Sequence, residues 1–205
     1  MNKLTIKANA ILNKSVEGYY HTDFYGSKNF TENPNYLYKF KNDPQHNWNE
    51  QQLNQAISQM RNVLLLDLPI ILKEQTVNSL TVCVVPRSKA DNTYRANQLL
   101  FKSTIKSVVK ELDGFLDGTD YIIRHKNTRT THLRRPMEGF ENDGRMPYKG
   151  ITAETCHISS NVINKDVLLI DDIYTHSVDI DEDAIQALFD NGAKTVIFYA
   201  IGRTV

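Results

Sequence analysis

Residues 166–179 read Asp-Val-Leu-Leu-Ile-Asp-Asp-Ile-Tyr-Thr-His-Ser-Val-Asp, and this stretch decides the fold class of the chain. Residues 167–170 are an unbroken run of β-branched and leucine side chains, which predicts a central strand covered on both faces. Asp171 and Asp172 follow at the carboxyl end of that strand. Because ligands of open α/β sheets bind at this edge, the acid pair is the first candidate site.

A turn and a helix follow the acid pair. Residues 175–179 predict a short turn, and apolar residues then recur at helical spacing from Ile180 to Leu188. Asn191-Gly192 ends this helix, and residues 195–200 predict the next buried strand. A turn at a helix N-terminus is a natural phosphate site, because free backbone N–H groups and the positive end of the helix dipole converge there.

With this order of features, residues 166–179 resemble the phosphoribosyl pyrophosphate (PRPP) motif of type I phosphoribosyltransferases: a hydrophobic strand, Asp-Asp, and a turn such as Thr-Thr-Gly-Ala-Thr. The resemblance implies an α/β fold with a mainly parallel central sheet flanked by helices, plus a small N-terminal extension or hood. It implies that Asp171 and Asp172 contact ribose hydroxyls, directly or through Mg²⁺. The turn that would bind the 5′-phosphate comprises Thr175, His176, Ser177, Val178 and Asp179.

Two residues of this turn depart from the family pattern. Ser177 stands where the family has glycine, whose missing Cβ permits close approach to a phosphate. Asp179 replaces a hydroxyl donor with an anion, and a carboxylate about 4 Å from one phosphate charge costs about 1 kcal/mol in water and ~4 kcal/mol at an effective dielectric of 20. Asp179 can instead cap the helix, and a protonated His176 would offset part of the charge. Phosphate binding by the turn is therefore left open.

A second candidate loop follows the first strand expected in the core, residues 79–85, which Pro86 ends. This loop contains Arg87, Ser88 and Lys89. In the resembling family the corresponding loop holds pyrophosphate, and two cations suit that role electrostatically. The alternative is a solvated turn at the start of a helix.

The nearest resemblance within the family is to the competence-protein ComF subgroup. It is carried by Tyr-Arg-Ala-Asn-Gln-Leu-Leu at residues 94–100 and by a basic stretch further on. The Cys-x-x-Cys pairs of the ComF zinc ribbon are absent from this chain. The family resemblance implies Mg²⁺ bound with PRPP as the cofactor, and because the Cys-x-x-Cys pairs are absent no zinc is expected.

The basic stretch spans residues 124–135 and holds five permanent cations, which are Arg124, Lys126, Arg129, Arg134 and Arg135. In enzymes of the fold a mobile loop here closes over the pyrophosphate, where negative charge builds as the glycosidic bond breaks. A solvated charge run is the plainer alternative. Single-stranded nucleic acid is another candidate anion, but the stretch lacks the aromatic residues of a stacking platform.

Composition excludes several classes of protein. Lysine plus arginine equals aspartate plus glutamate, at 24 each, so no overall field favours nucleic acid or an anionic membrane. Cys83 and Cys156 lie in apolar contexts and are expected to be reduced and buried, in a cytoplasmic protein. The longest apolar stretch, residues 63–72, is too short to cross a bilayer and contains Asp67, so no membrane partner is expected.

The pattern divides the chain near residue 75. Residues 1–75 are expected to form an N-terminal extension and a packing helix, and residues 76–205 a phosphoribosyltransferase-like core domain. Expected strands are 4–6, 36–40, 121–124 and 151–158, expected helices are 49–73 and 93–112, and 126–150 is a polar connection. The family resemblance also implies that the chain can form a homodimer.

Two functions from different classes follow. The first is a phosphoribosyltransferase-like glycosyltransferase that binds PRPP or a related ribose phosphate and transfers the phosphoribosyl group to a base or amine. The second is a catalytically degenerate module that senses a nucleotide or scaffolds a DNA-processing partner, of the competence or defence type. Ser177 and Asp179 favour the second.

Overall fold

The computed structural model of the chain describes residues 1–26, 33–41, 48–130, 144 and 149–205. The elements of the central sheet are β1 (Asn2–Ile6), β2 (Val16–Phe24), β3 (Leu80–Val84), β4 (Phe115–Asp117), β7 (Asp166–Tyr174) and β8 (Thr195–Thr204). The helices are α1 (Tyr36–Lys41), α2 (Glu50–Glu74), α3 (Leu100–Val109) and α4 (Ile180–Asp190). A separate antiparallel hairpin consists of β5 (Ile122–Arg124) and β6 (Cys156–Ile158).

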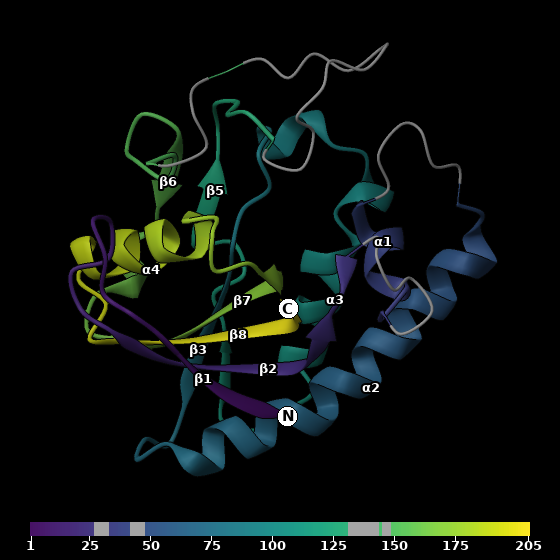
Figure 1. Cartoon of the computed structure of the whole chain (residues 1–205), viewed down its shortest axis with the longest axis horizontal. Helices are drawn as coiled ribbons and strands as arrows, with labels where there is room; N and C mark the ends of the chain where they lie inside the picture. Colours follow the sequence, from purple (N-terminus) through teal and green to yellow (C-terminus); the bar gives the residue numbers. More distant parts are fainter. Residues whose placement is uncertain (27–32, 42–47, 131–143, 145–148) are drawn as a thin grey trace.

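The six strands lie in the order β1-β2-β8-β7-β3-β4. All neighbours are parallel except β1, which runs antiparallel to β2 at the edge. The strand expected from the opening stretch therefore has parallel neighbours on both sides, with Leu168 opposite Val82 of β3 and Ile197 of β8. The chain has an α/β fold with a mixed, mostly parallel sheet flanked by helices, as Figure 1 shows.

Each face of the sheet has its own hydrophobic core, because successive residues of a strand point to opposite faces. Leu168 and Ile170 of β7 pack with α1, α2 and α3 on one face. Val167 and Leu169 pack with α4 and the β5–β6 hairpin on the other. This double burial explains why the strand reads as a continuous apolar run.

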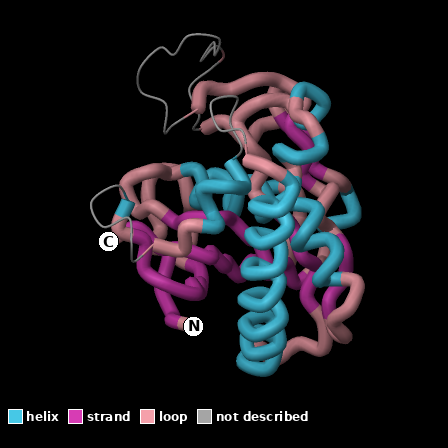
Figure 2. The backbone as a smooth tube through the Cα atoms, turned by 90° about the vertical axis from the view of Figure 1, so that its right-hand side faces the viewer, coloured by secondary structure: helices cyan, strands magenta, loops and turns pink. Residues whose placement is uncertain are grey.

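The long helix α2 confirms the helix expected at residues 49–73. Asn49 caps its start, because the Asn49 side chain accepts the Gln52 backbone N–H while the Gln52 side chain accepts the Asn49 N–H. The buried side chains recur at helical spacing and face the sheet: Leu53, Ala56, Met60, Leu64, Asp67, Leu68 and Ile71. In Figure 2 this helix runs down the face of the molecule turned to the viewer.

The strand expected at residues 36–40 is wrong, because this segment is the helix α1. Tyr36, Leu37 and Phe40, at positions i, i+1 and i+4, are its buried side chains. The helix expected at 93–112 is shorter and begins at Leu100, after two 3₁₀ turns. Side chains hold these turns, as the Thr93 hydroxyl donates to the Ala90 carbonyl and Gln98 Oε1 accepts the Arg95 N–H. Such local bonds compete with helix formation.

The edge strand expected at residues 151–158 is also shorter, because only Cys156–Ile158 is extended. The Thr155 hydroxyl accepts the Thr152 backbone N–H and holds the preceding residues in a turn. This strand pairs with β5, the expected 121–124 strand, and the two form the separate hairpin outside the main sheet.

The first 75 residues contribute to the central sheet. The chain pattern did not predict β2, which lies parallel to β8, with Gly18 opposite Phe198 and Tyr20 opposite Ala200. Gly18 and Tyr20 point to the same face, and glycine gives no side chain for a period-two signal. Helices α1 and α2 from the same segment cover one face of the sheet. Within the described ranges, no helix combines the length and the apolar character that crossing a bilayer requires.

Candidate functional site

The parallel pairing of β3 and β7 brings two expected site segments to one edge of the sheet. The Val85 N–H donates to the Ile170 carbonyl at 3.0 Å, which continues the pairing one residue beyond the end of β3. Residues 86–90, here called the β3 loop, therefore leave the sheet level with Asp171 and Asp172. Residues 175–179, here called the β7 loop, leave β7 at the same edge.

Asp171 and Asp172 lie within β7 and not after it, because β7 continues four residues beyond the expected end at Ile170. The strand can continue because β8 also extends, with Asp171 opposite Ala200. Both acids are half-buried. Asp171 Oδ1 accepts the Asp172 N–H and Asp172 Oδ1 accepts the Ile173 N–H, each at 2.8 Å, so both carboxylates are held close to the backbone.

Asp181, the second residue of α4, contacts this pair from the helix side. Its side chain is 3% exposed and hydrogen bonds the Asp171 side chain. Burial raises the pKa of Asp181 well above its ordinary value, and the negative charges of Asp171, Glu182 and Asp172 raise it further. Burial and these neighbouring charges therefore favour the protonated form of the Asp181 carboxyl.

Glu182 and Asp183 continue the acidic start of α4, and both are buried. Glu182 Oε1 accepts the Tyr174 hydroxyl at 3.1 Å. Asp183 Oδ2 accepts the backbone N–H groups of Gly150 and Ile151, at 2.6 and 2.9 Å. Burial raises the pKa of both carboxyls, although these hydrogen bonds act in the opposite direction. The positive end of the helix dipole stabilises the acids here.

Sequence reasoning missed these three acids. A signal was present for Asp181, because it precedes the buried residues Ala184, Ile185 and Leu188 by three, four and seven positions. This spacing places it on the apolar face of the helix. An acid on that face must lie in the core, where it needs a proton or a partner.

The β7 loop is compact and leaves several amides unpaired. The Val178 N–H donates to the Thr175 carbonyl, and the Thr175 and Thr204 hydroxyls share a hydrogen bond that ties the loop to β8. His176 and Ser177 are exposed. The backbone N–H groups of His176, Ser177 and Asp179 make no hydrogen bond to any residue that the structure describes. These groups are the ones a bound anion would use.

Asp179 occupies the N-cap position of α4, but its side chain does not cap the helix. Instead, Asp179 Oδ1 accepts the side-chain N–H of Asn9 at 3.0 Å. Asn9 is held in place because its Oδ1 accepts the backbone N–H groups of Ile11 and Leu12, both at 2.8 Å. The turn between β1 and β2 thus positions the one acid that the family pattern lacks.

The β3 loop is positioned by the segment that follows it. Arg87 Nη1 donates to the Gln98 carbonyl at 2.7 Å, and the Arg87 guanidinium lies 4.4 Å from the centre of the Tyr94 ring. The Lys89 backbone N–H donates to the Tyr94 hydroxyl, and the Lys89 side chain is buried. The Ser88 and Thr130 hydroxyls hydrogen bond at 2.7 Å.

Arg124 differs from the other cations of the basic stretch. It is 3% exposed, and its guanidinium donates to the carbonyls of Arg87 and Gly150, at 2.6 and 2.9 Å. In this position it joins β5, the β3 loop and the segment before β6. Lys126 and Arg129 are both exposed on the same stretch. Arg134 and Arg135 lie outside the described residues.

Asp171 and Asp172 can hold a magnesium ion only together with a bound ligand that supplies further oxygen atoms. Mg²⁺ prefers hard oxygen donors and is commonly held by one or two carboxylates together with substrate phosphates. Across the described residues, no group of three His, Cys, Asp or Glu side chains has the arrangement of a metal site. The acid pair therefore suits an ion that the ligand shares.

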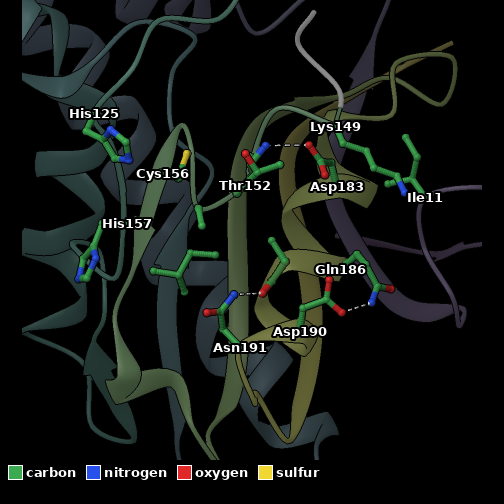
Figure 3. Close-up of a pocket in the computed structure, with 14 residues that line it drawn as sticks. Ile11, His125, Lys149, Thr152, Cys156, His157, Asp183, Gln186, Asp190 and Asn191 are labelled. Carbon is green, nitrogen blue, oxygen red and sulfur yellow. Dashed lines mark hydrogen bonds between the residues drawn. The ribbon is translucent and has the colours of Figure 1, made fainter. Parts of the chain in front are cut away.

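A separate hollow of about 540 Å³ lies between α4 and the β5–β6 hairpin, as Figure 3 shows. His125, Cys156 and His157 line it on the hairpin side, and Gln186 and Asp190 on the helix side. None of the site residues expected from the sequence lines it. Burial raises the pKa of the Cys156 thiol, which makes it a poor nucleophile.

The loops and acids at the edge of β3 and β7 are therefore the candidate site. Comparison with known proteins adds no family to this description. No protein-family model matches the chain, and no curated protein is significantly similar to it in sequence.

Proposed function

We propose that the chain is a phosphoribosyltransferase-like protein that binds PRPP or a related ribose phosphate, together with Mg²⁺, at the carboxyl edge of β3 and β7. One observation carries this proposal. The half-buried acid pair Asp171 and Asp172 lies between a cationic loop on the neighbouring parallel strand and a loop with three amides that bond no described residue. Acids for a diol, cations for a pyrophosphate and amides for a phosphate are the groups that such a ligand requires.

The proposal gives each segment a role. Asp171 and Asp172 hold the ribose hydroxyls or the magnesium ion, and the β7 loop holds the 5′-phosphate. Arg87, Ser88 and Lys89 hold the pyrophosphate, which leaves as a base or amine attacks the anomeric carbon. The remaining cations after β5 close over the leaving group. Arg124 is excluded from this lid, because its guanidinium is buried against two carbonyls.

The type I phosphoribosyltransferase fold is part of the proposal, and the mostly parallel sheet with helices on both faces supports it. A hood that selects the acceptor would come from the first 75 residues. This segment reaches the candidate site from two sides: Asn9 contacts Asp179, and α1 contacts the turn at Ala96–Gln98. A cytoplasmic location agrees with Cys83 and Cys156, which are both free and buried.

The negative charge of Asp179 is the main feature that opposes phosphate binding, and the contact with Asn9 reduces this repulsion. The side-chain N–H of Asn9 holds one carboxylate oxygen on the side of the β1–β2 turn. The amides of the β7 loop then remain available to a ligand. The remaining repulsion, about 1 kcal/mol for each charge pair about 4 Å apart in water, corresponds to about a fivefold loss of affinity.

Calorimetric titration with PRPP in the presence of MgCl₂ tests the proposal. The wild-type chain should bind, and Asp171→Asn with Asp172→Asn should weaken binding at least tenfold. The acid at the far end of α4 provides a matched control, since Asp190→Asn removes the same charge away from the site. Ser177→Gly with Asp179→Thr should bind about fivefold more tightly, because it removes the repulsion.

A second candidate function is a catalytically degenerate module that senses a nucleotide or scaffolds a DNA-processing partner. One observation favours it, namely the three buried acids at the start of α4, directly after the β7 loop. Their charges oppose a phosphate dianion wherever they are ionised. Binding that occurs only in the Ser177→Gly, Asp179→Thr variant would support this candidate. No binding by either protein would contradict the ribose-phosphate proposal.

A further inference from the structure

The outward face of α2 carries no charged side chain over most of its length. Between Gln51 and Ile70, every exposed residue of the helix is an amide, a serine, a proline or an aliphatic residue. We call these residues the α2 stripe: Gln51, Asn54, Gln55, Ser58, Gln59, Asn62, Leu65, Leu66, Pro69 and Ile70. Their three- and four-residue spacing makes them one continuous band.

The C-terminal half of the α2 stripe is apolar. Leu65, Leu66 and Ile70 are 36%, 63% and 44% exposed. Leu66 is the most exposed large hydrophobic residue in the part of the chain that the structure describes. Single exposed apolar residues are ordinary, but here three fall within six positions of one helix, beside Pro69. This clustering marks the stripe as a contact surface.

Charged residues on the two sides of the stripe are paired within the chain, and the exposed Lys73 lies at its C-terminal end. Arg61 makes two hydrogen bonds to Glu111 of α3, at 2.8 and 3.1 Å. On the other side, Lys3 of β1 forms an ion pair with Glu74 at 2.6 Å. A strongly charged partner would find no opposite charge along the stripe, and would have to bury its own charges there at a cost. The stripe therefore suits a partner that is itself neutral.

We propose that this partner is a second copy of the chain, and that two α2 helices pack across a twofold axis between Leu66 and Pro69. A second copy presents the same neutral band, so no charge is buried in the contact. Antiparallel helices with the axis at this point place Leu65 opposite the partner's Ile70. They also place Asn62 opposite the partner's Lys73, so an amide oxygen meets an exposed cation next to the patch. No like charges face each other along the stripe.

The size of the stripe sets the expected strength of the dimer. α2 has 25 residues and is ~37 Å long. The ten residues of the stripe are fewer than the roughly 20–30 residues per side of a standard stable interface. The dimer is therefore expected to dissociate in the micromolar range. It does not depend on the ribose-phosphate proposal, because the stripe contains none of the candidate site residues.

Sedimentation equilibrium over a range of protein concentrations tests the dimer. The mass of the wild-type chain should rise from 23.5 kDa to twice that value. Leu66→Lys with Ile70→Lys should keep it at 23.5 kDa, since both side chains are exposed and the new charges repel across the axis. The matched control is Leu116→Lys with Ile163→Lys, because these residues are 48% and 52% exposed on other elements, and it should behave as wild type.

Cysteine cross-linking tests the position of the axis. Cys83 and Cys156 are buried, so a new exposed cysteine would be the accessible thiol of the chain. With diamide as oxidant, Leu66→Cys should give a covalent dimer at concentrations where Ile163→Cys gives little. A wild-type chain that stays monomeric up to ~1 mM, far above a micromolar dissociation constant, would overturn the proposal. So would a dimer that survives the lysine substitutions in α2, or equal cross-linking of the two cysteine variants.

Discussion

The β3 loop and the β7 loop leave neighbouring parallel strands at the same edge of the sheet, but their surroundings carry opposite charge. The β3 loop contains Arg87 and Lys89. The β7 loop contains Asp179 and leads directly into the three buried acids of α4. Strand topology alone places both loops where a ligand binds. In the proposed function, the cations of the β3 loop attract the anionic ligand, whereas the β7 loop binds it through backbone amides.

The two loops also differ in how they are held. Segments distant in the chain fix the β3 loop: Arg124 donates to the Arg87 carbonyl, the Thr128 N–H donates to the Ser88 carbonyl, and Asn127 accepts the Ala90 N–H. The β7 loop is held by its own turn, by the Thr204 hydroxyl and by Asn9. Stability is therefore expected to respond strongly to changes beside the β3 loop. The β7 loop should respond mainly to protonation and to charge.

The largest effect is expected from Arg124→Met beside the β3 loop. The change removes the donors to the carbonyls of Arg87 and Gly150 in a buried site, where hydrogen bonds from a charged group contribute about 1.5–3 kcal/mol each. Urea unfolding should show a loss of about 3 kcal/mol or more. The control is Arg129→Met, an exposed cation of the same stretch, which should change little. Equal losses in the two variants would contradict the structural role of Arg124.

The second-largest effect is expected in the pH dependence of stability, from the change Asp181→Asn beside the β7 loop. The folded-state pKa of Asp181 lies well above the value of an unfolded chain, ~3.9. Its contribution to stability is therefore fully present below that unfolded value, and it is lost as pH rises through the folded pKa. Asp181→Asn removes this dependence, so its free energy of unfolding should fall less than that of wild type as pH rises from about 4 to about 8. The wild type should lose ~1.4 kcal/mol more than the variant for each unit by which the pKa of Asp181 in the folded chain exceeds its pKa in the unfolded chain.

Urea unfolding at several pH values measures this difference. Asp190→Asn serves as the control, because Asp190 lies at the other end of α4, and the control should follow the wild-type curve. The proton on Asp181 is not supported if Asp181→Asn also follows the wild-type curve. Glu182 and Asp183 remain in every variant, so the comparison reports the effect of the Asp181 carboxyl together with its coupling to Glu182.

The smallest effect is expected at the contact between Asn9 and Asp179. Asn9→Ala removes one exposed hydrogen bond, and stability should fall by about 1 kcal/mol or less. The affinity for inorganic phosphate should fall a few-fold, because the Asp179 carboxylate can then turn toward the amides of the β7 loop. Asn9→Asp, which sets two like charges together, should lower affinity further.

Titration calorimetry with phosphate measures both variants, and a double-mutant cycle isolates the contact. Combined with Asp179→Asn, the Asn9→Ala change should no longer affect phosphate affinity. If the effect of Asn9→Ala persists in the Asp179→Asn background, Asn9 acts on the loop by another route.

Prediction from the sequence succeeded where the pattern of apolar residues fits only one type of secondary structure. The apolar run before Asp171 and the spaced apolar residues of α2 can be buried in only one manner each, as a strand and as a helix. It failed at Tyr36–Lys41, where a six-residue segment satisfies both periods. It failed also at β2, whose alternation is interrupted by Gly18. In both cases contacts with segments distant in the chain determined the secondary structure.

For the candidate site, the sequence pointed to the acid pair and the two loops, but not to the burial and the hydrogen-bond partners of their side chains. Helical spacing already placed Asp181 on the apolar face of α4, so its burial was predictable in principle. The contact of Asn9 with Asp179 was not, since 170 residues separate the two in the chain. Likewise, Arg124 could not be distinguished from the other cations around it by its sequence context.

The sequence by itself determined the class of the fold, the strand that carries Asp171 and Asp172, and the loops on either side, because burial period and turn chemistry are local properties. Only the tertiary structure decided which charges are buried, paired or exposed. Those properties depend on which distant segments, such as the β1–β2 turn and the end of β5, pack against the site. Since the free energy of a charge depends on its surroundings, the chemistry of this site is a property of the folded chain.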